Sequence, residues 1–125
     1  AAREMMQTGD LIVPRINGIP YRDKPPASYW LIVLASLSSG RVSETTTRLP
    51  SAAATLLSIL LIYLIAGSYW DRKAALLAAL IFMTTYPLLR WSRTANADTL
   101  TLAGMLASLY FFVIHRHHPE KGTWL

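Results

Sequence analysis

The sequence predicts an all-α protein, a polytopic transmembrane helical bundle with interfacial helices and a proline-rich loop beside it. The first observation is three long runs almost free of charge, at residues 49–70, 74–89 and 98–114. Each run approaches or reaches the roughly 20 residues that cross a bilayer core. The second observation is that tyrosine and tryptophan gather at the ends of these runs, as they do at membrane interfaces.

Two regions follow from this pattern. Residues 1–48 form a loop with juxtamembrane helices, and residues 49–125 hold three transmembrane helices at about 49–69, 74–89 and 98–114, followed by a tail. The middle run is interrupted by Thr84, Thr85 and Pro87, so it needs neighbouring helices to complete a crossing.

The first region is expected to lie along the membrane surface. Residues 1–8 alternate apolar and polar side chains at helical spacing, and Gly9 is a natural helix end. Residues 27–37 are apolar but too short to span a bilayer, which indicates an interfacial helix. Ser43 with Thr46 three residues later predicts the start of the next helix.

Composition restricts the partners. The chain has 125 residues, 53% of them hydrophobic and 15% charged, with a net charge of +5 and no cysteine. The positive charge favours an anionic partner, and membrane lipid suits these apolar runs better than nucleic acid does. Disulfides and thiol chemistry are excluded, and no glycine-rich phosphate loop is present. His115, His117 and His118 fit a helix end at the interface better than a metal site.

A stiff loop carries the densest cluster of polar side chains. Four of the seven prolines lie within residues 14–26, which excludes a helix interior or a central strand there. Asn17-Gly18 predicts a tight turn, because both residues tolerate positive φ. The loop then presents four polar side chains in sequence, Tyr21, Arg22, Asp23 and Lys24. They suit an anionic group, and a solvated surface loop explains the same residues.

Two tight connections place the loops 1–48 and 90–98 on one membrane face and residues 71–73 with the tail on the other. Eight of the twelve basic residues then share the loop face, which the positive-inside rule would make cytoplasmic. Cations that bind a lipid phosphate would instead lie outside, so charge alone leaves the orientation open.

We expect the two loops to bring charged side chains together: Asp23 and Lys24 from the first, and Arg90, Arg93 and Asp98 from the second. An ionisable residue at the mouth of an apolar helix is a functional candidate. A purely structural role, in which the Asp98 carboxylate interacts with the positive end of the helix dipole, explains this residue equally well.

Several segments together resemble a known enzyme family. They are Ala-Arg-Glu-Met-Met-Gln-Thr-Gly-Asp (2–10), Val-Pro-Arg-Ile-Asn-Gly-Ile-Pro-Tyr-Arg-Asp-Lys-Pro-Pro (13–26), Tyr-Trp-Leu (29–31), Arg-Leu-Pro-Ser (48–51) and Asn-Ala-Asp-Thr (96–99). In combination they resemble the lipid-linked glycosyltransferases of the protein mannosyltransferase type (glycosyltransferase family 39), and most of all the bacterial aminoarabinose transferases that act on lipid A.

The resemblance implies the amino-terminal portion of a multi-pass enzyme of the bacterial inner membrane with the fold called GT-C. Such enzymes move a sugar from a polyprenyl phosphate carrier to an acceptor, which is lipid A, another glycolipid or a protein. The resemblance also implies that loop 1–48 faces the periplasm, against the simple charge rule.

The resemblance further implies roles for individual residues. Lys24 matches the lysine that contacts the carrier phosphate, with Tyr21 beside it, and Arg90 and Arg93 would add positive charge. Asp23 stands where relatives usually have a glutamate linked to a divalent metal ion or to substrate. Asp98 matches an acidic residue of the catalytic cavity. The principal catalytic acidic residue of the family lies just upstream of Ala1, so these 125 residues alone are expected to be inactive.

A second class of protein fits the same residues. A polytopic transporter or a lipid-binding membrane subunit would use the same cations to hold a substrate without breaking a bond. The donor sugar and the acceptor are not specified by the sequence.

Overall fold

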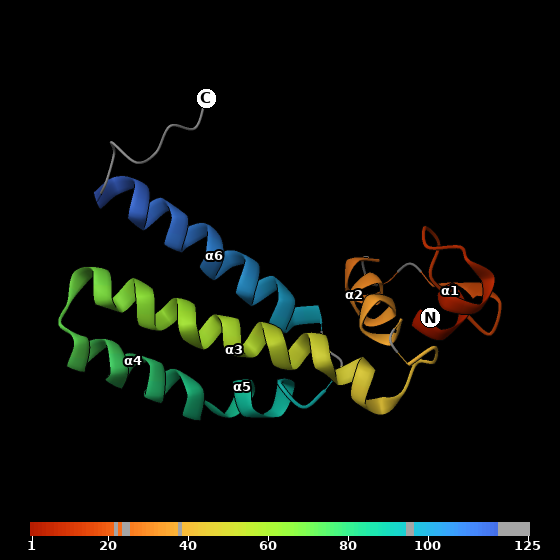
Figure 1. Ribbon diagram of the computed structural model, residues 1–125, viewed down its shortest axis with the longest axis horizontal. Helices are drawn as coiled ribbons and strands as arrows, with labels where there is room; N and C mark the ends of the chain where they lie inside the picture. Colours follow the sequence, from red (N-terminus) through yellow and green to blue (C-terminus); the bar gives the residue numbers. More distant parts are fainter. Residues whose placement is uncertain (22, 24–25, 38, 95–96, 118–125) are drawn as a thin grey trace.

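The computed structural model describes residues 1–21, 23, 26–37, 39–94 and 97–117. Six helices and one small hairpin occur in this part of the chain. Helices α3 (Glu44–Tyr69), α4 (Arg72–Thr84) and α6 (Ala97–His117) form an elongated bundle. Helices α1 (Ala2–Thr8) and α2 (Ala27–Ser36) lie with the hairpin at one end of this bundle (Figure 1). The expected predominance of helix is confirmed, and the hairpin is the exception to an all-α fold.

The first region begins with α1, and its end was predicted correctly. Gly9 takes a left-handed conformation (φ +74°), and its N–H donates to the carbonyl of Met5. Met5 is only 1% exposed and Ala2 is 7% exposed, so one face of α1 is buried. Burial of a methionine side chain stabilises by about 1.5–3 kcal/mol. Helix α1 packs against α2 and β1, and this packing gives the region its base.

The predicted turn is also present. Strands β1 (Arg15–Ile16) and β2 (Ile19–Pro20) pair in antiparallel register, with Ile16 opposite Ile19 and Arg15 opposite Pro20. Asn17 (φ +54°) and Gly18 (φ +78°) form the two-residue loop, as a type I′ turn requires. Because hydrogen-bonded and non-bonded pairs alternate, Pro20 needs no ladder N–H, and Tyr21 N–H then donates to Pro14 O at 2.7 Å.

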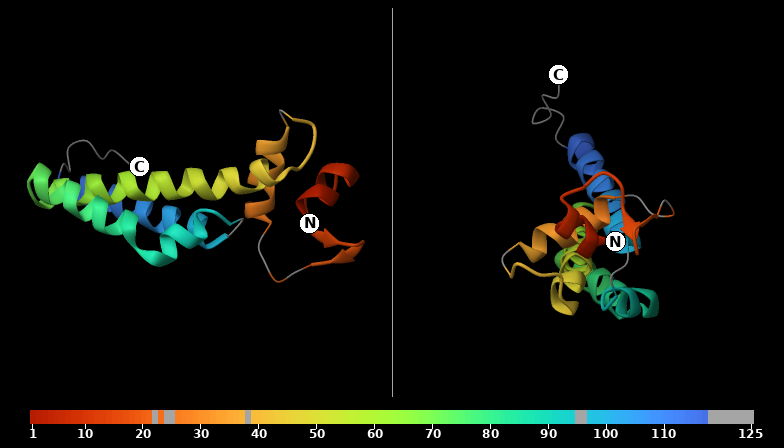
Figure 2. Two further views of the ribbon diagram at one scale, coloured as in Figure 1. Left: turned by 90° about the horizontal axis from the view of Figure 1, so that it is seen from below. Right: turned by 90° about the vertical axis from the view of Figure 1, so that its right-hand side faces the viewer.

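Helix α2 lies across the end of the bundle and packs against α3 (Figure 2). At ten residues it is too short to span a bilayer, as expected. The two helices also share a polar contact, since the buried Ser36 hydroxyl donates to Ile32 O (2.7 Å) and lies 2.9 Å from Thr46 Oγ1. The start of α3 is therefore fixed against α2.

The predicted start of α3 is confirmed by a reciprocal capping box. Ser43 accepts from Thr46 N–H (3.2 Å), and Thr46 Oγ1 accepts from Ser43 N–H (2.9 Å). Two amide groups that the helix itself leaves without partners are satisfied in this way.

Small side chains form the contacts of α3 inside the bundle. The buried positions of α3 are Ser51, Ala54, Thr55, Ser58, Leu61 and Ala66. The hydroxyls of Thr55 and Ser58 donate to carbonyls one turn back in the same helix, at 2.8 Å each. Helix α4 crosses equally closely, because Ala75 is fully buried and lies 3.8 Å from where a Cβ on Gly67 would be. Close approach of this kind is typical of membrane helices.

Two of the described helices, α3 and α6, are long and apolar enough to cross a membrane. Large apolar side chains on the bundle also point outward, among them Leu56, Leu60, Leu76, Leu80, Ile81, Phe111 and Phe112. A lipid surrounding accounts for this exposure.

The middle run differs from the single helix expected over 74–89. It is divided at Thr85 (ψ +127°) into α4 and the six-residue α5 (Tyr86–Trp91). Pro87 has no N–H, and in a continuous helix its ring would clash with the carbonyl of residue 83. A third crossing at this run stays a prediction.

The capping box gives a test of this account. We expect Ser43→Ala to lower the free energy of unfolding by about 1 kcal/mol, because Thr46 N–H loses its acceptor. Amide hydrogen exchange at Thr46 and Thr47 in the protein held in detergent micelles would measure the loss. Thr45→Ala, at an exposed first-turn position, is the control, and equal effects of both substitutions would contradict the role of the cap.

Candidate functional site

The site residues predicted from the first loop lie just after the hairpin. Tyr21 is half-buried and Asp23 is exposed, whereas Lys24 lies outside the described residues. Tyr21 and Asp23 both act electrostatically on Tyr29 in the first turn of α2. Burial first, and then these two neighbours, raise the pKa of the Tyr29 phenol. Tyr29 is therefore a neutral hydrogen-bond donor at physiological pH.

The residues predicted from the second loop lie at the same end of the bundle. Asp98 is exposed in the first turn of α6, and Arg93 is exposed just after α5. Arg90 Nη1 donates to the hydroxyl of Tyr86 at 3.2 Å within α5. Helices α5 and α6 contact each other.

A cavity of about 460 Å³ with mixed polar and apolar walls lies between the first region and the start of α6; it is called the polar cavity below to distinguish it from an almost wholly apolar groove beside it. Its walls come from α1, the hairpin turn, α2, the start of α3 and the first turn of α6. Polar lining residues include Glu4, Asn17, Ser28, Tyr29 and Thr47. Ala97 and Leu100 of the first turn of α6 line it as well, whereas Asp98 and Tyr21 are not among its lining residues. The volume falls in the range of small-molecule sites.

An apolar groove of about 520 Å³ adjoins this cavity. Leucines and small residues of three helices line it, among them Leu31 and Leu34 of α2, Ala53 and Leu57 of α3, and Gly104 of α6. Pro50 and Leu100 belong to both linings, so the polar cavity and the apolar groove share a wall. An amphiphile with a polar head and a long apolar tail matches this pair of spaces.

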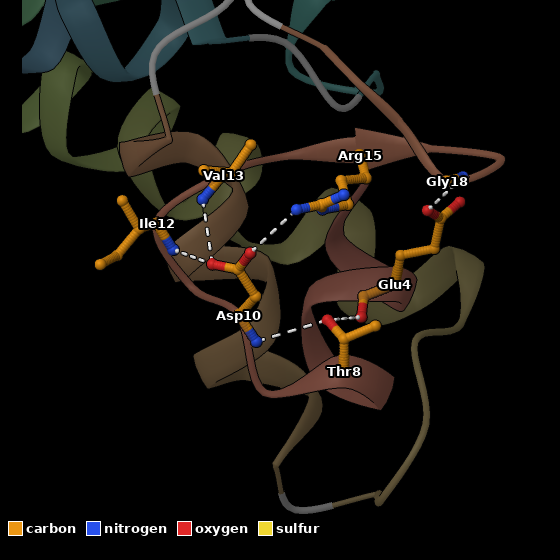
Figure 3. A network of polar contacts seen from close by, with 7 residues as sticks. All are labelled: Glu4, Thr8, Asp10, Ile12, Val13, Arg15 and Gly18. Atoms are coloured by element: carbon orange, nitrogen blue, oxygen red, sulfur yellow. Dashed lines mark hydrogen bonds and ion pairs between the residues drawn. The ribbon is translucent and has the colours of Figure 1, made fainter.

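A network of carboxylate contacts ties α1 and the segment before β1 to the hairpin (Figure 3). The Glu4 carboxylate accepts from the turn amides, with Oε1 2.7 Å from Asn17 N and Oε2 3.1 Å from Gly18 N. The two amides, Gly18 first, lower the pKa of Glu4. On α1 itself, Thr8 Oγ1 donates to Glu4 O (2.8 Å) and accepts from Asp10 N (3.3 Å).

Asp10 fixes the chain that leads into the hairpin. Its Oδ1 accepts from Ile12 N–H (3.1 Å) and Val13 N–H (3.2 Å), and its Oδ2 lies 3.7 Å from the Arg15 guanidinium. Trp30 of α2 adds a contact to the same segment, since its indole Nε1 donates to Leu11 O at 2.6 Å. The segment between α1 and β1 is therefore held by contacts of Asp10 with its following residues and by the Trp30 contact from α2.

The Asp23 metal hypothesis finds no ligand set in the described part of the chain. No three His, Asp or Glu side chains there gather closely enough to hold a metal ion. A zinc site needs three or four protein ligands, and Asp23 offers one exposed carboxylate. We therefore derive no step through a metal.

Sequence reasoning missed two residues of this site. No site role was predicted for Glu4, which falls in the amphipathic segment 1–8, or for Tyr29, which falls in the Tyr-Trp-Leu segment of the resemblance. The signal for Glu4 was indirect: a two-residue hairpin loop leaves amides without partners in the hairpin, and these need an acceptor. Nothing local indicates which carboxylate supplies it.

Comparison with known proteins gives the family. Residues 23–125 match the family model described as dolichyl-phosphate-mannose-protein mannosyltransferase. The chain belongs to this family.

Among individual relatives, the undecaprenyl phosphate-alpha-4-amino-4-deoxy-L-arabinose arabinosyl transferase of Aeromonas hydrophila is 34% identical over 98% of this chain and 22% of its own length. The enzyme of the same name from Aeromonas salmonicida is 38% identical over 96% of the chain and 22% of its length. That of Pseudomonas savastanoi pv. phaseolicola is 42% identical over 66% and 16%. The chain thus spans about a fifth of these relatives. No solved structure matches it.

The Asp10 network predicts a pH dependence. Its amide partners, Val13 first, and Arg15 hold the pKa of Asp10 below the ordinary 3.8. The stabilisation is therefore complete above that pH and is lost as the pH falls through the lower, folded-state pKa. We expect amide protection at Ile12 and Val13, measured by hydrogen exchange relative to intrinsic rates, to fall only in that acidic range. In Asp10→Asn this pH-dependent fall in protection should be absent. A fall that persists in the variant would assign the titration to another group.

Proposed function

We propose that the chain is part of a membrane glycosyltransferase of the GT-C type that moves a sugar from a polyprenyl phosphate carrier to an acceptor. The observation that carries this proposal is the polar cavity with an apolar groove along one wall. A lipid-linked sugar has the same two-part chemistry. The names of the relatives, which specify undecaprenyl phosphate-linked aminoarabinose, support this donor class.

The proposed reaction is a displacement at the anomeric carbon. The acceptor hydroxyl gives its proton to a carboxylate, its oxygen forms a bond to the anomeric carbon, and the bond from that carbon to the phosphate oxygen breaks. The polyprenyl phosphate leaves with the bonding electrons. We assign the proton-accepting role to Asp98, since the neighbouring residues of its helix turn line the cavity.

The leaving phosphate needs positive charge as the bond breaks. Lys24, Arg90 and Arg93 are the proposed cations, because charge-assisted hydrogen bonds stabilise the developing negative charge. Tyr21 would add a hydroxyl donor beside them. Charges that must reach a lipid phosphate suit the water–lipid boundary, and we place this face in the periplasm of a multi-pass inner-membrane protein. Lipid A, another glycolipid and a protein are the candidate acceptors.

The role of Asp98 can be tested in the full-length protein reconstituted into liposomes. With undecaprenyl phosphate-linked aminoarabinose as donor, we expect Asp98→Asn to lower sugar transfer by about 100-fold or more, as loss of a general base does. We expect Lys24→Ala to weaken donor use as well. Asp71→Asn is the matched control: Asp71 caps α4 at the other end of the bundle, and asparagine caps equally well.

Undiminished transfer in both Asp98→Asn and Lys24→Ala would remove this site assignment. Donor binding without any transfer by the unaltered full-length protein, with this or other lipid-linked sugars, would favour the transporter or lipid-binding alternative.

The groove gives an independent test. We expect Ala53→Phe to fill the space between α2, α3 and α6 and to raise the KM for a long-chain donor about 10-fold or more. A donor with a short prenyl chain should be affected less, because it occupies less of the groove. Leu56→Phe, which faces outward from α3 next to the groove residues, is the control. Equal effects on both donors would show that the groove holds no carrier chain.

A further inference from the structure

We propose that Glu4 is a positioning residue of this site: its carboxylate clamps the Asn17-Gly18 turn, whose Asn17 lines the cavity, to α1 and so fixes the start of the segment that leads to Tyr21. This inference rests on the proposed function and adds a residue to it. Neither the order of residues along the chain nor the family resemblance assigns a role to Glu4.

The first step is the fit between the carboxylate and the turn. In a two-residue hairpin loop, the amides of both loop residues lie outside the ladder. The Glu4 carboxylate meets them with one oxygen each, at 2.7 Å from Asn17 N and 3.1 Å from Gly18 N. Asn17 follows Glu4 by 13 positions and Gly18 follows it by 14, so these hydrogen bonds form a tertiary clamp.

The second step is that the clamp has a firm base. Glu4 lies on α1 beside Met5, which is 1% exposed, and α1 packs against α2. The Thr8 hydroxyl bonds to the carbonyl of Glu4 itself at 2.8 Å. Because α1 packs against α2, the Glu4 clamp also fixes the turn relative to α2.

The third step carries the position from the turn to Tyr21. Strand β2 is two residues long, and Tyr21 follows it directly with its N–H bonded to Pro14 O (2.7 Å). Trp30 and Asp10 fix the incoming side of the hairpin, and Glu4 holds its tip through the amides of Asn17 and Gly18.

The fourth step is that the clamp forms part of the cavity wall. Glu4 and Asn17 both line the 460 Å³ space together with Tyr29 and Ala97. Both carboxylate oxygens already accept amide hydrogens, which suits a wall element better than a proton acceptor. Release of the clamp should therefore disturb donor binding more than the chemical step.

The experiment compares Glu4→Gln with the matched Glu44→Gln in the full-length protein. Glu44 is exposed on the first turn of α3 and pairs with Arg48. In liposomes with undecaprenyl phosphate-linked aminoarabinose, we expect Glu4→Gln to raise the donor KM at least 5-fold and to change kcat less than 3-fold. Glu44→Gln should change neither. Amide exchange at Asn17 and Gly18, which needs no activity, should become about 10-fold faster in Glu4→Gln alone.

The contrary results separate the clamp itself from its positioning role. Unchanged exchange would refute the clamp, and faster exchange with unchanged KM would refute the positioning role. A large loss of kcat at unchanged KM would instead make Glu4 part of the chemistry. If Asp98→Asn and Lys24→Ala also leave transfer intact, the proposed site fails, while the exchange result still decides whether the clamp exists. Glutamine is isosteric, so a loss of folding, checked by size-exclusion chromatography, would also count against a purely local positioning role.

Discussion

Close packing of α3 against its neighbours determines where both cavities lie. Helix α3 contacts α2, α4 and α6, and its buried positions are mostly small, with Ala54 and Ser58 facing inward. In lipid there is no hydrophobic force between apolar helices, so association depends on the close fit that small side chains allow. Larger residues along α3 would move α2 and α6 outward and separate the two linings that meet at Pro50 and Leu100.

The same contacts show how polar atoms are accommodated in the bundle. Thr55 and Ser58 are buried, yet each hydroxyl finds a carbonyl one turn back on its own helix. The described buried side-chain polar atoms all have partners. A hydroxyl satisfied within its helix imposes no direction on the neighbouring helix. The lateral fit is therefore set by shape, and the directional polar contacts are concentrated at one end, around α1, α2 and the hairpin.

Local signals in the sequence predicted the fold well wherever one or two residues decide the conformation. Gly9 ends α1, Asn17-Gly18 forms the turn, and Ser43 with Thr46 starts α3, because each outcome depends on neighbours within four positions. The break at Thr85 was foreseen only as a weakness, since it depends on whether surrounding helices compensate for Pro87. The cavity walls and the Glu4 clamp depend on contacts between residues far apart, which hydrophobic periodicity does not specify. The roles of Lys24 and Asp98 came from the family resemblance and remain predictions.

The first region combines exposed apolar side chains with a network of polar contacts. Leu11, Ile12 and Ile19 are exposed beside a network of charged and amide groups, and Trp30 is 48% exposed while its indole N–H is bonded to the backbone. A segment with both properties suits a boundary at which lipid and water are both within reach. Under the proposed function, the phosphate of the carrier would lie at that boundary, with its sugar on the water side and its chain in the bilayer. Because the cavity and the apolar groove share a wall at Pro50 and Leu100, the head and the chain of the proposed donor would occupy adjoining spaces.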